Sequence, residues 1–247
     1  MLQRDLTDGI LTLRIDHGKA GAMDVELVRA VFAELDDAVE ARAVVLTGTG
    51  SIFSAGVDLF RLTQGGAEYV REFFPLLTQF IHRLFTLPVP LVIAANGHSI
   101  AGGGLMVMAG DHRLMAEGGA RIGVPELLVG VPFPAAPLEL VRYAANPSIV
   151  QQLVLMGRTF TAEEALANGL VDELVDPETL IERARTVAKQ LAAVPPEVFR
   201  LTKERLRAEA TRRMEDAAAH DEHALALWCA DETHDRIRAY LEKTVRR

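Results

Sequence analysis

The segment that decides the fold is LVIAANGHSIAGGGLMVMA, residues Leu91 to Ala109. Its first five residues form a short apolar run that predicts a buried strand, and Asn96-Gly97 predicts a turn after it. The glycines 102–104 then precede the apolar run Leu105–Ala109, which predicts the start of a helix. Glycines at a helix N-terminus expose unpaired N–H donors in a positive field, so they form a candidate site for a developing oxyanion. Close packing of helix against strand is the alternative role of the same glycines.

The same order of strand, loop and helix recurs around this segment. Ile10–Ile15 alternates as a strand does, and a helix is expected from Asp24 onward. Ala43–Thr47 is a β-branched run that predicts a buried strand, and an amphipathic helix is expected over about residues 68–85. This alternation favours an α/β core with largely parallel strands. After about Pro195 the chain is rich in Ala, Glu, Arg and Leu, which predicts a helical C-terminal part.

Composition excludes several classes of protein. The 247 residues are 49% apolar and 24% charged, which excludes disordered and low-complexity chains. The chain has 26 basic and 34 acidic residues, and the resulting charge of −8 disfavours binding to nucleic acid or to an anionic membrane. The single cysteine, Cys229, excludes an intramolecular disulfide and a cysteine-rich zinc module. With no targeting segment and no apolar run that could span a bilayer, we expect a cytoplasmic protein.

Two further segments carry candidate functional residues. FSAGVDL, Phe53 to Leu59, has small residues that let a ligand approach the backbone, with the N–H of Val57 pointing outward. A tight turn with Asp58 as a helix cap is the alternative interpretation. RIGVPELLVGVPFP, Arg121 to Pro134, places one carboxylate, Glu126, inside an apolar stretch. A buried glutamate can act as a base or acid near neutral pH, whereas an exposed loop glutamate or a charge at a helix N-terminus has a structural role.

The remaining polar motifs are weaker. His220 and His223 are three residues apart, which does not match the H-E-x-x-H pattern of zinc helices, so no metal site is expected. His98 lies near the glycines without a visible partner, which favours a structural role. Ser54 and Ser99 lack the G-x-S-x-G elbow of serine hydrolases.

Together these segments resemble the crotonase superfamily, the enoyl-CoA hydratase/isomerase family. The similarity covers almost the whole chain, in five motifs that follow the family's order: Gly18–Leu27, Ala43–Leu59, Ala94–Ala116, Leu155–Val175 and Asp235–Lys243. The resemblance implies an α/β spiral of ββα units over residues 1–194, which binds acyl-CoA and carries out catalysis. It also implies a helical region, 195–247, that mediates assembly into a homotrimer or a hexamer. The implied substrate is an acyl-CoA thioester, with no cofactor besides the CoA of the substrate itself.

The resemblance also implies roles for individual residues. Glu126 is expected to be the catalytic residue, and the N–H groups of Val57 and Gly103 are expected to form an oxyanion hole, at about 3 kcal/mol per donor. The residues expected to contact the substrate are Lys19, Ala20, Ala22, Ser54, Ala55, Gly56, Asp58, Leu59, Gly102, Met106, Pro125 and Lys243. Of these, Lys19 and Lys243 are expected to meet the CoA phosphates.

One position departs from the family pattern. Family hydratases use two glutamates beside a water, one of them two residues after the third glycine, and that position is Met106 here, which cannot transfer a proton. A single glutamate, Glu126, is enough to move a proton between two carbons. The Pro-Phe that follows it, at 132–133, is similar to that of the Δ3,Δ2-enoyl-CoA isomerases. We therefore expect isomerisation of a 3-enoyl-CoA, with Met106 lining a dry pocket that excludes water.

Several alternatives remain open at this point. Glu139 or Glu68 could replace the missing glutamate and restore hydration. Decarboxylation, thioester hydrolysis and non-catalytic acyl-CoA binding also fit the glycine motifs. The side chains expected to shape the acyl pocket, unless they are ordinary core, are Phe73, Phe74, Leu77 and Phe80.

Overall fold

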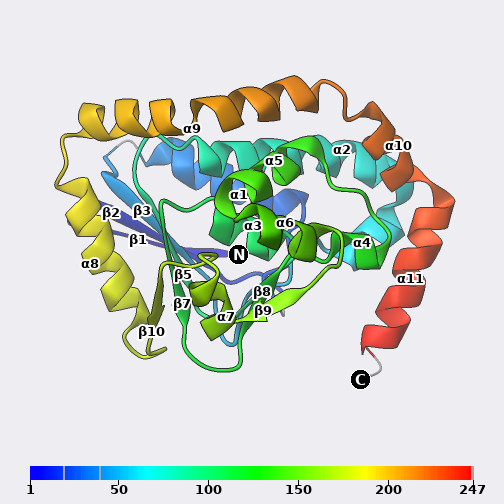
Figure 1. Ribbon diagram of the computed structural model, residues 1–247, viewed down its shortest axis with the longest axis horizontal. Coiled ribbons are helices and arrows are strands. Elements are labelled where there is room, and N and C mark those ends of the chain that lie inside the picture. The colour runs from blue at the N-terminus through cyan, green and yellow to red at the C-terminus, as the bar shows by residue number, and fades with distance from the viewer. Residues whose placement is uncertain (19, 39, 246–247) are drawn as a thin grey trace.

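Two sheets form the centre of the computed structural model, which describes residues 1–18, 20–38 and 40–245 (Figure 1). The larger sheet has six strands in the order β1 (Leu2–Thr7), β2 (Ile10–Ile15), β3 (Ala43–Thr47), β5 (Leu91–Ala95), β7 (His112–Ala116) and β10 (Glu173–Val175). The smaller sheet has four strands in the order β4 (Ile52–Ser54), β6 (His98–Ile100), β8 (Arg121–Gly123) and β9 (Thr159–Thr161).

A repeated ββα unit builds both sheets. The first strand of each unit, β3, β5 or β7, joins the larger sheet, and the second, β4, β6 or β8, joins the smaller one. A helix follows each pair of strands: α2 (Leu59–Phe85), α3 (Gly102–Met108) and α4 (Glu126–Val129). Successive first strands pair in parallel, and so do successive second strands. The predicted spiral of ββα units is therefore confirmed.

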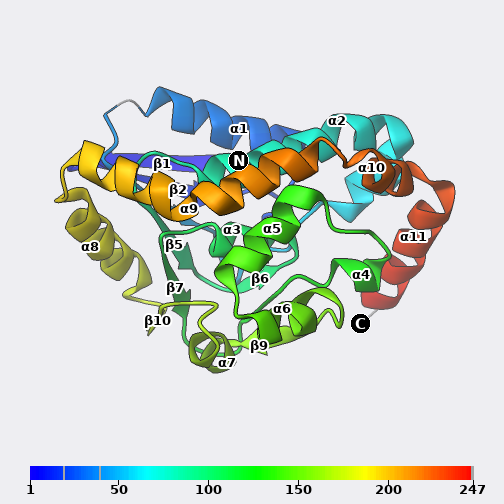
Figure 2. The same cartoon turned by 45° about the horizontal axis from the view of Figure 1, so that its top comes forward.

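Helices cover both faces of the larger sheet (Figure 2). On one face, α8 (Leu180–Ala192) packs against Val45, Val92 and Leu114 in a separate apolar cluster. The opposite face holds the main core, where α1 (Val25–Asp37), α2 and α3 meet. Between α4 and β10 the chain forms three more helices, α5 (Ala135–Ala144), α6 (Pro147–Val154) and α7 (Ala162–Ala167). The alternate residues of each strand thus face two different cores, as the two-residue period of a strand requires.

The C-terminal part is helical, as predicted, and consists of α9 (Pro196–Ala218), α10 (Glu222–Cys229) and α11 (Asp231–Val245). Figure 1 shows α9 running from α8 to α10 over α2 and α5. A buried ion-pair cluster ties α9 to the larger sheet, because Asp111 accepts from Lys203 Nζ at 2.6 Å and from Arg207 Nη2 at 2.9 Å. Removing one member of such a cluster leaves a buried charge unpaired, which is strongly destabilising. The cluster therefore anchors α9 to the core.

Two features differ from the expected elements. The N-terminal strand β1 was not expected, since its residues mix charges with single apolar side chains. Helix α2 begins at Leu59 and not near residue 68, and it is kinked at Gly66, where φ is 62°. Asp58 caps this helix by accepting from the N–H groups of Phe60 and Arg61, each at 3.0 Å. In the described ranges, none of the helices has the length and apolar character needed to cross a membrane.

Candidate active site

A cavity of about 520 Å³ brings together the three segments that the sequence singled out. Its described lining comes from five stretches of the chain, within residues 17–22, 55–60, 100–101, 125–131 and 228–241. The first four belong to the ββα units and their loops, and the last belongs to α10 and α11. Most of these side chains are apolar, which is usual for a pocket that binds an organic ligand.

The glycines bring two backbone segments into direct contact. A Cβ atom on Gly56 would lie 2.8 Å from the nitrogen of Gly102, and a Cβ atom on Gly103 would lie 2.2 Å from the carbonyl oxygen of Ser54. Neither distance can be accommodated, so both positions require glycine. Gly56 also has a φ of 82°, which few other residues adopt. The N-terminus of α3 therefore lies against the loop that follows β4.

The loop after β4 leaves one backbone donor unused. Within it, Ala55 N donates to Ala20 O at 3.0 Å, and Asp58 N donates to Met23 O at 2.8 Å. The N–H of Val57, between them, makes no hydrogen bond within the described part of the chain, and Val57 lines the cavity. The loop after β4 thus has an unused backbone N–H at a residue of the cavity lining.

The first residues of α3 supply further donors. Gly102 and Gly103 are the first two helical residues, and N–H groups at these positions have no acceptor within the helix. Ala101 precedes them and lines the cavity with a φ of 52° and a ψ of −123°. Such a backbone conformation costs roughly 1–3 kcal/mol in a residue with a Cβ atom. Sequence reasoning missed this feature, because an alanine carries no sign of a positive φ.

Glu126 is the buried carboxyl that the sequence hypothesis required. It is the first residue of α4, its side chain lines the cavity, and the residue is 8% exposed. Burial raises the pKa of Glu126 to about 8, against the opposing effect of its own backbone N–H. Its Oε2 atom is buried and has no hydrogen-bond partner within the described residues. A carboxyl in this state can exchange a proton with a ligand near neutral pH.

Two other ionisable groups of the cavity lining, Asp58 and His17, have hydrogen-bond partners. Asp58 caps α2, as described above. His17 Nε2 lies 2.7 Å from Asp24 Oδ2, and Asp24 Oδ1 caps α1 by accepting from Leu27 N at 2.8 Å. The described part of the chain contains no group of three or more residues that could hold a metal ion.

The structure brings together most of the predicted site residues. The cavity is lined by Ala20, Ala22, Ala55, Val57, Asp58, Leu59, Pro125 and Glu126. Three more of the predicted site residues, Gly56, Gly102 and Gly103, are buried and are not among the described lining. Ser54 is also buried, and its hydroxyl donates to Gly21 O at 2.7 Å.

The two predicted phosphate ligands are not among the described lining of the cavity. Lys243 is exposed on α11, near the end of the described chain. Lys19 lies outside the described residues.

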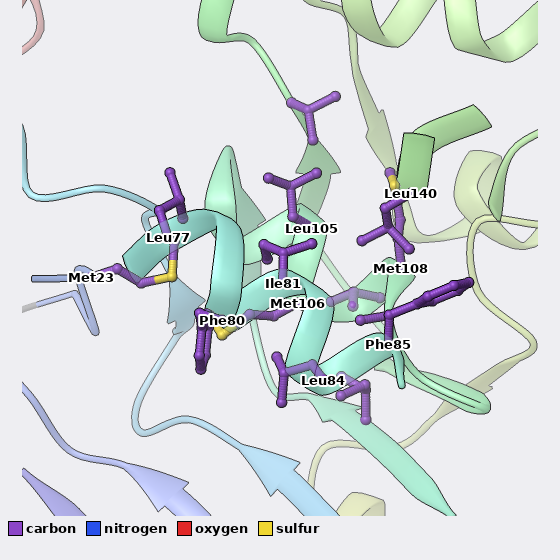
Figure 3. Packing of buried hydrophobic residues seen from close by; sticks show 14 of the residues in the cluster. Met23, Leu77, Phe80, Ile81, Leu84, Phe85, Leu105, Met106, Met108 and Leu140 are labelled. Carbon is purple, nitrogen blue, oxygen red and sulfur yellow. The ribbon is translucent and has the colours of Figure 1, made fainter. Parts of the chain in front are cut away.

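Met106 does not line the cavity, contrary to the expectation of a dry pocket wall. It is fully buried in the main core, and Figure 3 shows it in the same cluster as Phe80 and Ile81 of α2. Leu105, its neighbour, is 2% exposed and also belongs to that core. Every residue of α3 is buried, because the helix is packed between α2 and the strands.

The predicted acyl-pocket side chains of α2 are ordinary core residues. Phe73, Phe74, Leu77 and Phe80 are all buried and absent from the described cavity lining. The possible substitute acids are also elsewhere. Glu139 is buried and pairs with Arg142 and with Arg213, whose Nε lies 2.9 Å from Glu139 Oε2. Glu68 is exposed on α2.

Sequence reasoning missed the residues that the C-terminal helices contribute. Trp228, Tyr240 and Leu241 line the cavity opposite the ββα units. Their segment has the composition of any amphipathic helix, so the sequence carried no signal for this role. The motif Asp235–Lys243 contains Tyr240 and Leu241, but only Lys243 of this motif was expected to contact the substrate.

Known proteins match this chain over most of its length. A family model described as enoyl-CoA hydratase/isomerase matches residues 8–246. A putative enoyl-CoA hydratase of Thermus thermophilus is 37% identical over 238 residues, which are 92% of each chain. A protein of Mycobacterium tuberculosis, 31% identical, has been described as a probable enoyl-CoA hydratase in one solved structure and as an enoyl-CoA isomerase in another.

The TM-scores of those two structures are 0.86 and 0.83, and the matches cover 92% and 88% of this chain and 96% of each of the other chains. Human mitochondrial Δ3,Δ2-enoyl-CoA isomerase shares the fold with a TM-score of 0.92 at 23% identity, over 100% of this chain and 98% of that chain.

Proposed function

This chain belongs to the enoyl-CoA hydratase/isomerase family, and we propose that it is a Δ3,Δ2-enoyl-CoA isomerase in which Glu126 moves the proton. The observation that carries the proposal is the buried Glu126 carboxyl, whose Oε2 atom has no partner within the described residues. The residues after the glycines, Leu105 and Met106, are apolar and buried, so the second acid of a hydratase is missing there. One carboxyl suits a reaction that removes a proton and returns it to the same substrate.

The backbone donors would bind the thioester carbonyl of a 3-enoyl-CoA. The N–H of Val57 and the N–H groups of Gly102 and Gly103 are the donors available at the contact between the two loops. As the C2 proton leaves, negative charge develops on the thioester oxygen. Each preorganised donor lowers the barrier by about 3 kcal/mol, because it stabilises that charge without reorganisation.

Glu126 would carry the proton from one carbon to the other. Its carboxylate takes the C2 proton, and the C2–H electron pair spreads through the C3–C4 double bond and the carbonyl as a dienolate. The protonated Glu126 then delivers the proton to C4, and the double bond settles between C2 and C3. Atoms and charge balance without water, a metal or a cofactor other than the CoA of the substrate. A pKa near 8 suits both steps at neutral pH.

The test is a pair of assays with matched variants. Purified protein is assayed with 3-hexenoyl-CoA for isomerisation and with 2-hexenoyl-CoA for hydration, beside Glu126→Gln and the surface control Glu68→Gln. We expect isomerisation by the wild type and by Glu68→Gln, and a loss of at least about 100-fold in Glu126→Gln. Undiminished isomerisation by Glu126→Gln would overturn the proposal.

Hydration is the second candidate, and the names of the relatives favour it. It needs a second proton-transfer group beside the water, and Asp58 or Tyr240 of the cavity lining would have to supply it. Hydration of 2-hexenoyl-CoA as fast as isomerisation would establish this alternative. Binding of both esters without turnover would point to another reaction of the family or to a non-catalytic acyl-CoA-binding protein.

We also propose that the chain assembles into a homotrimer or a hexamer. Exposed apolar side chains support an interface, with Leu155 66%, Met156 68% and Leu206 70% exposed. Leu155 and Met156 adjoin in the chain, and exposed apolar residues that adjoin can form part of a contact between subunits. Light scattering of the purified protein measures the mass of the particle in solution. A measured mass equal to that of one chain, 26.9 kDa, would contradict assembly.

A further inference from the structure

We propose that Trp228 forms the closed end of the acyl pocket and sets the longest acyl chain that the enzyme accepts. This inference rests on the proposed function, because it assumes that an acyl-CoA ester occupies the cavity of Glu126. Trp228 is a large side chain, it is 2% exposed, and it lines the same cavity as Glu126. It comes from α10, far from the catalytic segments in the sequence, and no motif pointed to it.

Two contacts of the indole ring and one contact of its backbone hold Trp228 in place. Its indole Nε1 donates to the carbonyl oxygen of Pro132 at 2.9 Å. Its ring meets Phe74 of α2 edge to face, with 5.5 Å between the ring centroids and 78° between the planes. Its own carbonyl oxygen lies 3.0 Å from Nε2 of the buried His234. A side chain fixed in this way cannot rotate out of the path of a longer ligand.

The hydrogen bond to Pro132 places Trp228 next to the catalytic helix. Pro132 follows α4, which begins at Glu126, and Val129 and Val131 between them also line the cavity. Helix α11 contacts α4 as well, and both views show the two helices at the same end of the molecule (Figure 1, Figure 2). The lining from these segments is mostly apolar, with Val129, Val131, Trp228 and Leu241, and Tyr240 adds one hydroxyl.

The other segments of the lining contribute the charged and imidazole groups of the cavity beside further apolar side chains. Ala20 O accepts from Ala55 N there, and His17 and Asp58 belong to the same lining. The CoA part of a substrate carries phosphates and amides, and the acyl part is hydrocarbon. We therefore assign the CoA part to the lining near His17 and Asp58, and the acyl chain to the lining near Trp228.

A rigid wall predicts a sharp limit of chain length. When the acyl chain reaches the indole, the cavity has no free volume for one further methylene. The longer chain then strains the packing, and its last methylene does not gain the favourable free energy of transfer from water into the apolar pocket. Discrimination of roughly 10-fold or more per added methylene is typical of such hydrophobic pockets. A pocket that opened to solvent would instead tolerate longer chains with little change in kcat/KM.

Trp228 is the only tryptophan of the sequence, so its fluorescence reports directly on the contact. Wild-type protein is titrated with free CoA and with saturated butanoyl-, hexanoyl-, octanoyl- and decanoyl-CoA, which cannot isomerise. We expect no change of emission with free CoA and the shorter esters, and a clear change from one chain length onward. That length should equal the one beyond which kcat/KM for 3-enoyl-CoA esters falls. A change as large with free CoA as with octanoyl-CoA would place Trp228 beside the CoA arm and overturn the proposal.

Two variants test the wall by activity. Trp228→Leu removes most of the indole, and Trp228→Phe keeps the contact with Phe74 while shortening the side chain. Leu225→Ala is the control, because Leu225 packs α10 against the core without lining the cavity. We expect both Trp228 variants to gain roughly 10-fold or more in kcat/KM for the first ester beyond the limit, relative to 3-hexenoyl-CoA. Leu225→Ala should keep the wild-type profile.

The outcomes of these experiments separate the inference from the proposed function. Protein that isomerises 3-hexenoyl-CoA but shows the same chain-length profile in both Trp228 variants supports the function and overturns the inference. Protein without isomerase activity overturns the function, while the fluorescence titration still decides whether Trp228 meets the acyl chain. An equal shift in Leu225→Ala would attribute the effect to loosening of α10 and overturn the specific role of Trp228.

Discussion

Gly56 and Gly102 approach each other so closely that a Cβ atom on Gly56 would lie 2.8 Å from the Gly102 nitrogen. The two residues come from different ββα units: Gly56 lies in the loop after β4, and Gly102 is the first residue of α3. Their contact sets the distance between the N–H of Val57 and the N-terminus of α3. The oxyanion hole of the proposed mechanism thus depends on a backbone contact that only glycine permits.

Gly56→Ala should therefore abolish most of the activity. The methyl group collides with Gly102 and also meets a φ of 82°, so the two loops must separate. We expect a loss of about 100-fold or more in kcat for 3-hexenoyl-CoA, the usual effect of misplacing an oxyanion donor. Gly50→Ala is the matched control, because Gly50 has a φ of 64° with no neighbouring atom within 4 Å. Equal losses in both variants would assign the effect to backbone strain alone.

The activity should rise with pH. Burial raises the pKa of Glu126 to about 8, and the carboxylate is the form that removes the C2 proton. The logarithm of kcat/KM should increase with a slope near one below this pKa and level off above it, since kcat/KM reports the free enzyme. The measurement is isomerisation of 3-hexenoyl-CoA at subsaturating concentration across the pH range. A profile that is flat from about pH 6 to pH 9 would contradict a buried, mostly protonated base.

Glu126→Gln should stabilise the fold, and more so at higher pH. The folded-state pKa of Glu126 is about 8 and its ordinary value is 4.5, so between these values the unfolded chain ionises and the folded chain does not. The wild type therefore loses about 1.4 kcal/mol of stability per pH unit in this window, from Glu126 alone. Below pH 4.5 the carboxyl is neutral in both states, and above about 8 the loss stops growing.

Urea unfolding of wild type and Glu126→Gln at several pH values measures this difference. The stability gap should widen from about pH 5 to pH 8 and then stay constant. The surface variant Glu68→Gln, with an exposed side chain, should show no such widening. A gap that is independent of pH would mean that the Glu126 carboxyl is ionised in the folded protein throughout.

Ala101→Gly should relieve backbone strain at the cavity. Ala101 has a φ of 52°, and glycine adopts this conformation without the steric cost of a Cβ atom. The relief of roughly 1–3 kcal/mol exceeds the extra entropy of an unfolded glycine, so we expect a gain of about 1 kcal/mol in stability. Ala145→Gly, at a φ of −119°, is the control and should be destabilising. Thermal unfolding measures both, and a loss of stability in Ala101→Gly would show that Ala101 is not strained.

Much of the core could be predicted from local patterns. The strands at Ala43–Thr47 and Leu91–Ala95 are buried on both faces, and such strands are continuous apolar runs that stand out in the sequence. The cap at Asp58 followed from residue type, but the earlier start of α2 did not, because the Gly65-Gly66 pair interrupts the helical pattern. The strand β1 was not recognised, because its own pattern of side chains does not indicate a strand. It is a strand because it pairs with β2.

The sequence by itself determined the chemical groups of the site. The sequence alone indicates free N–H donors at the glycines 56, 102 and 103, and a buried carboxyl at Glu126, which lies inside an apolar stretch. Both features depend only on the residue type and on its neighbours in the chain. Tertiary structure alone decided where Met106, Trp228 and Ala101 lie. Met106 is buried in the core. Trp228 lines the cavity from a helix that follows Glu126 by more than a hundred residues in the chain. Such placements depend on packing between distant segments, which no local pattern of residues records.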